Sequence, residues 1–265
     1  MSATQSDHPL AVVTGASTGI GREVAILLAE QGYDLVICAD DAEIHTVLPE
    51  SPGLAVEPVQ ADLSTYDGVE DLLDAVGERD VDALVLNAGI AVGGSFVETS
   101  LDDDLALIGL NISANVHLAK RLLPRMVAAG RGRVLLTGSV TSMLPGPYYA
   151  TYSASKAFLL NFAQSVRYEL KDTGVTLTTM MPGPTDTEFF SRAGMEDTRV
   201  GRSDSKDDPV EVARDGIAAM LEGKDDAVVG ATVRNTLMSR ATKPLPERTK
   251  AATQARLTKP LDEGE

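Results

Sequence analysis

The chain has 265 residues, of which 43% are hydrophobic and 23% charged, and its formal net charge is −16. This size and composition predict one globular α/β domain with ample material for a buried core. The negative charge argues against nucleic acid as a partner, because general electrostatics would repel a phosphate backbone. No stretch reaches the roughly 18 apolar residues of a membrane span, so we expect no membrane partner.

The cysteine content and the N-terminal residues bear on location. The single cysteine, Cys38, lies in an apolar run, which excludes an internal disulfide and favours a reducing compartment. The first residues contain neither a basic stretch nor a long apolar run of the kind found in secretion signals. We therefore expect a cytoplasmic protein.

Short apolar runs alternate with longer amphipathic ones, which is typical of βα units around a parallel sheet. Strands are predicted at residues 10–14, 34–39, 54–60, 82–86, 133–137, 175–180 and 227–229. Helices are predicted at residues 20–30, 66–77, 101–129, 151–171 and 209–221, with at most a helical stub in 40–49. The pattern predicts a single doubly wound parallel sheet with helices on both faces, spanning residues 10–238.

The two ends of the chain are predicted to lie outside this domain. Residues 1–9 are expected to form a flexible N-terminus. Residues 239–265 form a polar tail rich in lysine, arginine and glutamate, with prolines at 244, 246 and 260. Part of the tail can be helical, but its composition indicates no second domain.

The turn after the first strand reads Thr-Gly-Ala-Ser-Thr-Gly-Ile-Gly at residues 14–21. Glycines let a backbone approach a pyrophosphate closely, and the N–H groups of the following helix favour an anion. The spacing is Gly-x3-Gly-x-Gly, not the commoner G-x-G-x-x-G. From this stretch alone, a plain flexible turn stays open as the alternative.

Tyr152 and Lys156 lie one turn apart on a predicted helix, so they share a face. A nearby ammonium group favours phenolate and lowers a tyrosine pKa that is ordinarily about 10. A tyrosine and a lysine at this spacing are common by chance. The pair gains meaning from Ser139, which follows a predicted strand and lies thirteen residues before Tyr152.

In order and spacing, these motifs resemble those of the short-chain dehydrogenase/reductase family, over about residues 10–187. The residues that carry the resemblance are the glycine turn, Asn87-Ala88-Gly89, Asn111, Ser139, Tyr152, Lys156 and Pro182-Gly183. The resemblance implies a Rossmann-type fold with a nicotinamide cofactor at the carboxyl ends of the strands. It implies cofactor contacts from Gly15, Ser17, Thr18, Gly19, Ile20, Gly21, Asp62, Leu63, Asn87, Ala88, Gly89, Tyr152, Lys156, Pro182, Gly183, Thr185 and Thr187.

The same resemblance implies the catalytic roles. Ser139 would hold the substrate oxygen, Tyr152 would transfer the proton, and Lys156 would lower the tyrosine pKa and bond the nicotinamide ribose. Asn111 would hold a water that links Lys156 to solvent; by itself it is equally a buried asparagine that caps a helix irregularity. Ser142 is an alternative hydroxyl, but the spacing to Tyr152 selects Ser139. Tyr148 and Tyr149 have no lysine four residues on and are interpreted as pocket walls.

Asp40 bears on the choice of cofactor. In the family, an acidic residue after the second strand accepts from the ribose hydroxyls, whereas an arginine there binds the phosphate of the phosphorylated cofactor. Here the usual acidic position falls on Ala39 and the usual arginine position on Asp40. A ribose phosphate would face Asp40 and Asp41 with Arg22 as the nearby cation, which is unfavourable. NAD is therefore favoured, and NADP is the alternative.

The segment after the sixth strand, residues 188–208, matches the family's substrate loop. It begins Phe189-Phe190 and includes Met195. With Val92, Leu144, Pro145 and Tyr149, it would make a moderately apolar pocket for a hydrophobic secondary alcohol or ketone. Two alternatives to such an oxidoreductase stay open: an epimerase or dehydratase, and a nucleotide-binding regulatory protein without turnover.

The family resemblance also bears on assembly, and the histidines bear on metal binding. The helices at 101–129 and 151–171 form the dimer interface in many family members, which implies a homodimer or homotetramer. His8, His45 and His117 are far apart and lack the spacing of metal ligands. We expect no metal site.

Overall fold

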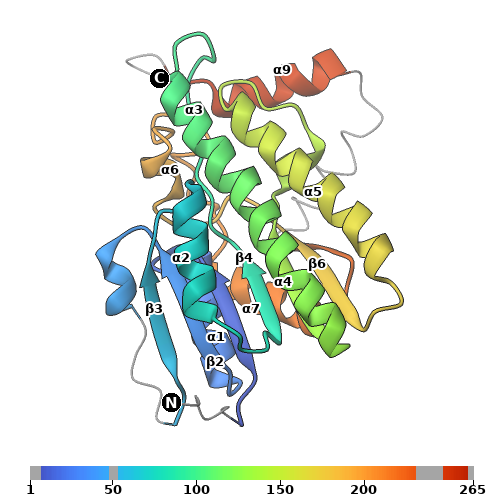
Figure 1. Cartoon of the computed structure of the whole chain (residues 1–265). Helices are drawn as coiled ribbons and strands as arrows, with labels where there is room; N and C mark the ends of the chain where they lie inside the picture. Colours follow the sequence, from blue (N-terminus) through green and yellow to red (C-terminus); the bar gives the residue numbers. More distant parts are fainter. Residues whose placement is uncertain (1–6, 48–52, 231–246, 262–265) are drawn as a thin grey trace.

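The computed structural model of the chain describes residues 7–47, 53–230 and 247–261. Its centre is a sheet of seven strands in the order β3-β2-β1-β4-β5-β6-β7 (Figure 1). Every neighbouring pair is parallel. The strands are β1 (Leu10–Thr14), β2 (Asp34–Ala39), β3 (Val56–Gln60), β4 (Ala83–Leu86), β5 (Gly132–Thr137), β6 (Val175–Pro182) and β7 (Asp226–Val229).

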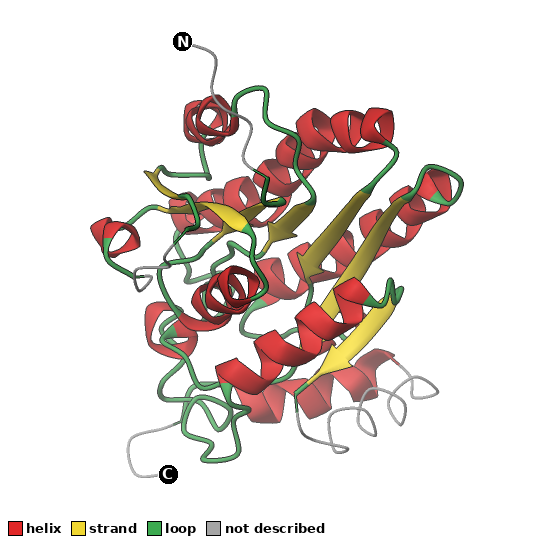
Figure 2. Cartoon of the chain, turned by 90° about the horizontal axis from the view of Figure 1, so that it is seen from below, coloured by secondary structure: helices red, strands yellow, loops and turns green. Residues whose placement is uncertain are grey.

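Helices cover both faces of this sheet (Figure 2). One layer contains α1 (Gly19–Glu30) and α7 (Pro209–Leu221). The other contains α2 (Tyr66–Val76), α4 (Asn115–Ala129) and α5 (Ala150–Leu170). The shorter or peripheral helices are η1 (Ala42–His45), α3 (Leu101–Ile108), η3 (Val140–Met143), α6 (Phe189–Arg192) and α9 (Glu247–Thr258). The predicted doubly wound, Rossmann-type arrangement is confirmed.

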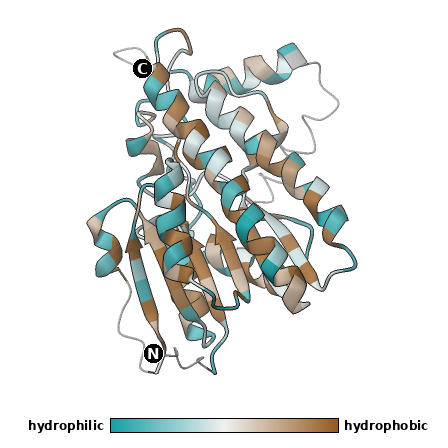
Figure 3. Cartoon of the chain, in the orientation of Figure 1, coloured by the Kyte–Doolittle hydropathy of each residue, from teal (hydrophilic) through white to brown (hydrophobic). Residues whose placement is uncertain are grey.

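The central strands β1, β2 and β4 are buried along their whole length and are largely apolar on both faces, whereas the edge strands β3 and β7 are partly exposed (Figure 3). Successive side chains of a strand point to opposite sides of a sheet. Val12 and Leu84 accordingly belong to the core under α2, α4 and α5. Their sequence neighbours Val13 and Val85 belong to the core under α1 and α7. One sheet thus separates two hydrophobic cores, which explains the unbroken apolar runs of the sequence.

The strand order reverses between β1 and β4. The chain proceeds from β1 outward to β2 and β3, then returns to β4 on the other side of β1. The loops after β1 and β4 consequently leave the sheet in opposite directions and open a crevice at the carboxyl ends of these strands. Parallel α/β sheets bind their ligands at such a point.

The structure corrects the prediction of one unbroken helix over residues 101–129. A π-helical stretch, η2 (Gly109–Ala114), separates α3 from α4. In the predicted polar tail, α9 forms an ordered helix, while residues 239–246 and 262–265 lie outside the described residues, as do residues 1–6 of the predicted flexible N-terminus. Within the described ranges, no helix is both long and apolar enough to cross a bilayer.

Candidate active site

A cavity of about 580 Å³ lies at the carboxyl ends of the central strands. It is lined by the glycine turn, by the loops after β2 to β6, by α5 and by α9. Ser139, Tyr152 and Lys156 line it, whereas Asn111 is fully buried behind the wall. Of the predicted cofactor contacts, Gly21 alone does not line it; those that do are Gly15, Ser17, Thr18, Gly19, Ile20, Asp40, Asp62, Leu63, Asn87, Ala88, Gly89, Tyr152, Lys156, Pro182, Gly183, Thr185 and Thr187.

The glycine turn is shaped as a cradle for an anionic group. Gly15 and Gly19 have φ angles of +65° and +56°, a backbone conformation that residues other than glycine rarely adopt. Gly21 is needed for packing, since a Cβ there would lie 2.0 Å from the Gly15 carbonyl oxygen. The turn leads directly into the N-terminus of α1, whose N–H groups favour negative charge. These residues fit the pyrophosphate of a dinucleotide.

Asn87 and two threonines hold this cradle against the sheet. The Asn87 Nδ2 donates to the carbonyl oxygens of Thr14 and Gly15, both at 3.2 Å. The Asn87 Oδ1 accepts from Thr137 Oγ1 at 3.1 Å. Thr14 Oγ1 in turn accepts from the backbone N–H groups of Asn87 and Ala88. Thr137, which the sequence analysis did not single out, thus links the turn after β1 to the loops after β4 and β5.

The two aspartates after β2 have different surroundings. Asp41 accepts from Ser17 Oγ at 2.7 Å and from the Glu43 backbone N–H at 3.1 Å, so it ties the glycine turn to the start of η1. Asp40 is exposed, lines the cavity, and its carboxylate has no ion-pair partner among the described residues. Arg22, the nearby cation, is paired with Glu23 at 2.6 Å.

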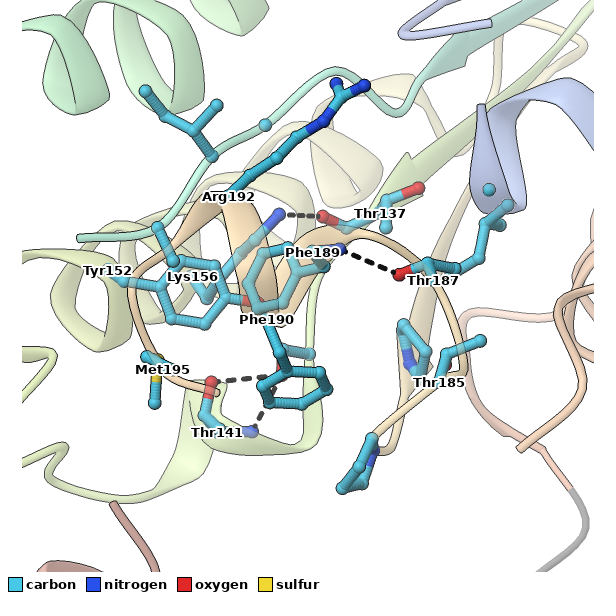
Figure 4. Close-up of a pocket in the computed structure, with 18 of the residues that line it drawn as sticks. Thr137, Thr141, Tyr152, Lys156, Thr185, Thr187, Phe189, Phe190, Arg192 and Met195 are labelled. Atoms are coloured by element: carbon cyan, nitrogen blue, oxygen red, sulfur yellow. Dashed lines mark hydrogen bonds between the residues drawn. The ribbon is translucent and has the colours of Figure 1, made fainter. Parts of the chain in front are cut away.

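Tyr152 and Lys156 lie in the first turns of α5, where they are 8% and 4% exposed. The Lys156 Nζ donates to the Thr137 carbonyl oxygen at 2.8 Å, as Figure 4 shows. It lies 5.7 Å from the centre of the Tyr152 ring. The predicted pairing on one helix face is confirmed, and the end of β5 positions the ammonium group.

Burial governs the pKa values of both groups. It raises the pKa of Tyr152 to about 12, with the Ser139 hydroxyl acting in the opposite direction. It lowers the pKa of Lys156 to about 8. The expected lowering of the tyrosine pKa by Lys156 is therefore not seen in the protein alone, because both charged forms are disfavoured by removal from water.

Ser139 and Ser142 have separate roles at the start of η3. Ser142 Oγ accepts from the Ser139 backbone N–H at 3.2 Å within a capping box, and Ser142 does not line the cavity. Ser139 Oγ accepts from the backbone N–H and the hydroxyl of Thr141, at 3.2 and 3.0 Å, and faces the cavity. The geometry supports Ser139 over Ser142 as the candidate that meets a substrate.

Asn111 lies within η2 and bonds in three directions. Its side chain exchanges two hydrogen bonds of 2.9 Å with the Ile90 backbone and donates to Ser155 Oγ at 3.0 Å. Its carbonyl oxygen accepts from Asn115 Nδ2 at 2.8 Å. Ser155 donates to the Tyr152 carbonyl oxygen at 2.7 Å, which connects η2 to α5. Asn115 and Ser155 were not predicted from the sequence; the signal for Asn115 was a second asparagine one helical turn after Asn111.

Aromatic and aliphatic side chains surround the Tyr152 ring. Phe189 lies 5.3 Å from it, centre to centre, and Phe190 and Met195 belong to the same apolar cluster (Figure 4). Tyr149 and Leu144 also line the cavity. Of the other predicted pocket residues, Val92 packs against this cluster, while Pro145 and Tyr148 are not part of the lining.

Residues that the sequence analysis missed complete the cavity. Arg192 and Arg199 come from the segment predicted as the substrate loop, residues 188–208, and Gln254, Leu257 and Thr258 come from α9. Arg192 pairs with Glu188 at 2.7 Å and points away from Tyr152 in Figure 4. The helical part of the predicted tail is therefore a wall of the candidate site.

Two further predictions concern groups away from the cavity. His117 pairs with Glu70 at 2.7 Å, and the described residues contain no cluster of potential metal ligands. Cys38 is fully buried in the core, and burial raises the pKa of its thiol to about 12.

Comparison with known proteins gives consistent likenesses. The family model for short chain dehydrogenases matches residues 9–197. Dehydrogenase/reductase SDR family member 7B of Bos taurus is 31% identical over 245 residues, which cover 84% of this chain and 73% of the bovine protein. Sulfoacetaldehyde reductase 2 of Chromohalobacter salexigens is 33% identical over 189 residues, which cover 68% of this chain and 74% of that protein.

Solved structures agree with these sequence matches. A short-chain dehydrogenase from Sphingobium yanoikuyae in complex with NADPH has a TM-score of 0.79 at 29% identity, covering 96% of this chain and 98% of that one. One from Burkholderia phymatum in complex with NAD has a TM-score of 0.77 at 23% identity, covering 98% and 99%. The second likeness concerns the fold.

Proposed function

The chain belongs to the short-chain dehydrogenase/reductase family of NAD(P)-dependent oxidoreductases, and we propose that it interconverts a secondary alcohol and the corresponding ketone. The observation that carries the proposal is one cavity that joins the glycine cradle to Ser139, Tyr152 and Lys156. A nicotinamide bound there supplies or accepts the hydride.

The protein's own groups manage the substrate oxygen and its proton. The Ser139 hydroxyl holds the oxygen, and the Tyr152 hydroxyl donates the proton to it during reduction or removes it during oxidation. Burial keeps Tyr152 protonated, which suits the role of donor. Lys156 is held by the Thr137 carbonyl and provides a cation beside the tyrosine when it is protonated.

The test is the Tyr152→Phe variant, assayed with alcohols and ketones at the nicotinamide absorbance. We expect kcat to fall by roughly 10²- to 10⁴-fold, because the proton donor is lost. Tyr149→Phe is the matched control, since Tyr149 lines the same cavity and is also buried. A Tyr152→Phe enzyme that keeps the parent rate would refute the assignment.

The same assay separates the alternatives. An epimerase or dehydratase that oxidises only transiently would convert substrate without a net change in nicotinamide absorbance. A regulatory protein would bind the nucleotide and turn over none of the panel.

We also propose that NAD is preferred to NADP. Asp40 supports this, because its carboxylate is unpaired among the described residues and would repel a ribose phosphate. The nearby Arg22 is neutralised by Glu23. The related structures named above hold NADPH and NAD respectively, so likeness alone does not choose between the two.

Calorimetric titration with NADH and NADPH measures this preference. We expect tighter NADH binding by the parent, and we expect Asp40→Ser to reduce the preference by about fivefold, since one exposed charge is worth about 1 kcal/mol. Asp62→Asn is the control, because Asp62 lines the same end of the cavity after a different strand. Tighter NADPH binding by the parent would overturn the proposal.

Assembly as a homodimer or homotetramer and a cytoplasmic location stay proposals. Leu101, Leu105, Ile108 and Phe158 are exposed apolar side chains of α3 and α5, which supports association through these helices. Sedimentation velocity of the parent measures the assembly, and a monomer at micromolar concentration would contradict it. Fluorescence microscopy of the tagged protein in its own host tests the location, and a signal confined to the envelope would contradict it.

A further inference from the structure

The cavity reaches beyond the catalytic groups to the place where α9 packs on the substrate loop. This α9 end of the cavity is lined by Arg199, Val200, Ser203, Ser205, Gln254, Leu257 and Thr258. The helix is fixed to both neighbouring walls. Thr258 Oγ1 donates to the Pro147 carbonyl oxygen at 2.8 Å, and the Val200 N–H donates to the Leu257 carbonyl oxygen at 3.1 Å. The α9 end is therefore a built part of the site.

Gln254 places a polar group in this part of the wall. The residue is 9% exposed and lines the cavity. Its side-chain amide makes no hydrogen bond within the part of the chain that the structure describes, and it is not among the side-chain groups sealed off from solvent. The amide therefore faces the open cavity and is free to bond a polar group of a ligand there.

Arg199 gives the α9 end a positive charge. Its guanidinium has no ion-pair partner in residues 7–47, 53–230 and 247–261. The carboxylates that line the cavity are elsewhere, at Asp40, Asp62 and Glu188. Other cations of the substrate loop are paired: Arg192 with Glu188 at 2.7 Å, Arg202 with Asp197 at 3.2 Å and Lys206 with Asp186 at 3.9 Å. In a chain of net charge −16, an unpaired arginine at a pocket wall favours an anion.

We propose that the substrate is an oxo- or hydroxycarboxylic acid whose carboxylate binds Arg199 and Gln254. The planar arginine fork and the amide N–H groups match the two carboxylate oxygens. Val200, Leu257 and Met195 are apolar members of the same lining, which suits a hydrocarbon segment between the carboxylate and the reacting carbon. This inference rests on the proposed alcohol–ketone chemistry and names its substrate class.

The kinetic test compares oxo acids of graded chain length with their methyl esters. We expect the parent to favour an acid over its ester in kcat/KM. Arg199→Gln should lower kcat/KM for that acid by about 10- to 100-fold, and Gln254→Leu by about tenfold, mainly through KM. The loss for the ester should be several-fold smaller in both variants, because the ester carries no charge. Arg202→Gln is the matched control, because it removes the same charge from a paired arginine outside the lining.

A binding test keeps this inference separate from the catalytic one. Calorimetry of the NADH-bound protein uses saturated carboxylic acids that lack the ketone, together with their methyl esters, and needs no turnover. The parent should bind the acid more tightly than the ester, and Arg199→Gln should lose that difference.

Equal binding of acid and ester by the parent, or no binding of either, overturns the carboxylate site. Variants that weaken acid and ester alike also overturn it, since they indicate a structural role. Acid-selective binding without turnover by the parent supports the carboxylate site and contradicts the proposed oxidoreductase activity.

Discussion

Lys156 illustrates how burial of a single side chain sets both chemistry and stability. Its ammonium group is held by the Thr137 carbonyl, and burial lowers its pKa to about 8 from an ordinary value of 10.5. The unfolded chain therefore binds this proton more tightly than the folded protein does. Burial of the charged Lys156 therefore destabilises the folded protein by its full amount below pH 8, and this destabilisation disappears as the pH rises toward 10.5.

Lys156→Met removes this titration and should change how stability depends on pH. As the pH rises from 7.5 to 10, we expect the free energy of unfolding of the parent to increase relative to that of the variant by up to about 3 kcal/mol. Urea unfolding at both pH values measures the difference. Lys120→Met, at an exposed position of α4, is the control. A constant difference between parent and Lys156→Met across this range would contradict the prediction.

The motif residues show what spacing can and cannot predict at this scale. Tyr152 and Lys156 follow from helical periodicity, and the structure brings both to the cavity. The roles of Asp40 and Asp41 did not follow, because adjacent residues after a strand point in different directions. The hydrogen bond between Asp41 and Ser17 joins positions 24 residues apart, and such a contact cannot be predicted from the local sequence pattern.

Among the elements, η2 is the clearest departure from the sequence prediction. A π turn accommodates an extra residue within a helix, and π-bulges are often found at functional sites. Here it places the Asn111 side chain on the Ile90 backbone and on Ser155. The helix also contains Pro124, and its hydrophobic pattern is compatible with an unbroken helix, so periodicity alone did not reveal the π turn.

Asn115 stabilises that turn, because its side-chain amide donates to the Asn111 carbonyl oxygen. Asn115→Ala should lower the free energy of unfolding by about 1–3 kcal/mol, since a buried carbonyl loses a partner. It should also lower kcat, because the Asn111–Ser155–Tyr152 connection loosens. Asn161→Ala, at an exposed position of α5, is the control for thermal unfolding and kinetics. Unchanged stability and kcat in Asn115→Ala would rule out this role.

The contribution of α9 was not predictable from its composition. In an amphipathic helix, apolar residues at helical spacing indicate which face is buried. The buried residues of α9 are instead Gln254 and Thr258, both polar, one turn apart. The helix docks through hydrogen bonds to Pro147 and to Val200, which lie more than fifty residues away in sequence.

At the scale of the whole molecule, the sheet and its two cores were well predicted. Strands buried on both faces have continuous apolar runs, and these mark their positions to within about two residues. The parallel order follows from the alternation of strands and helices. The cavity's far wall is formed by tertiary contacts of polar segments, for which the sequence offers no comparable pattern.

The position of α9 in the chain also orders events during synthesis. A ribosome releases the chain from its N-terminus, and domains can begin to fold before synthesis ends. The glycine turn, Ser139, Tyr152, Lys156 and the seven strands of the sheet precede Gly230, whereas Gln254 and Thr258 follow it. The nascent chain therefore acquires most of the cavity lining first and completes the wall formed by α9 last.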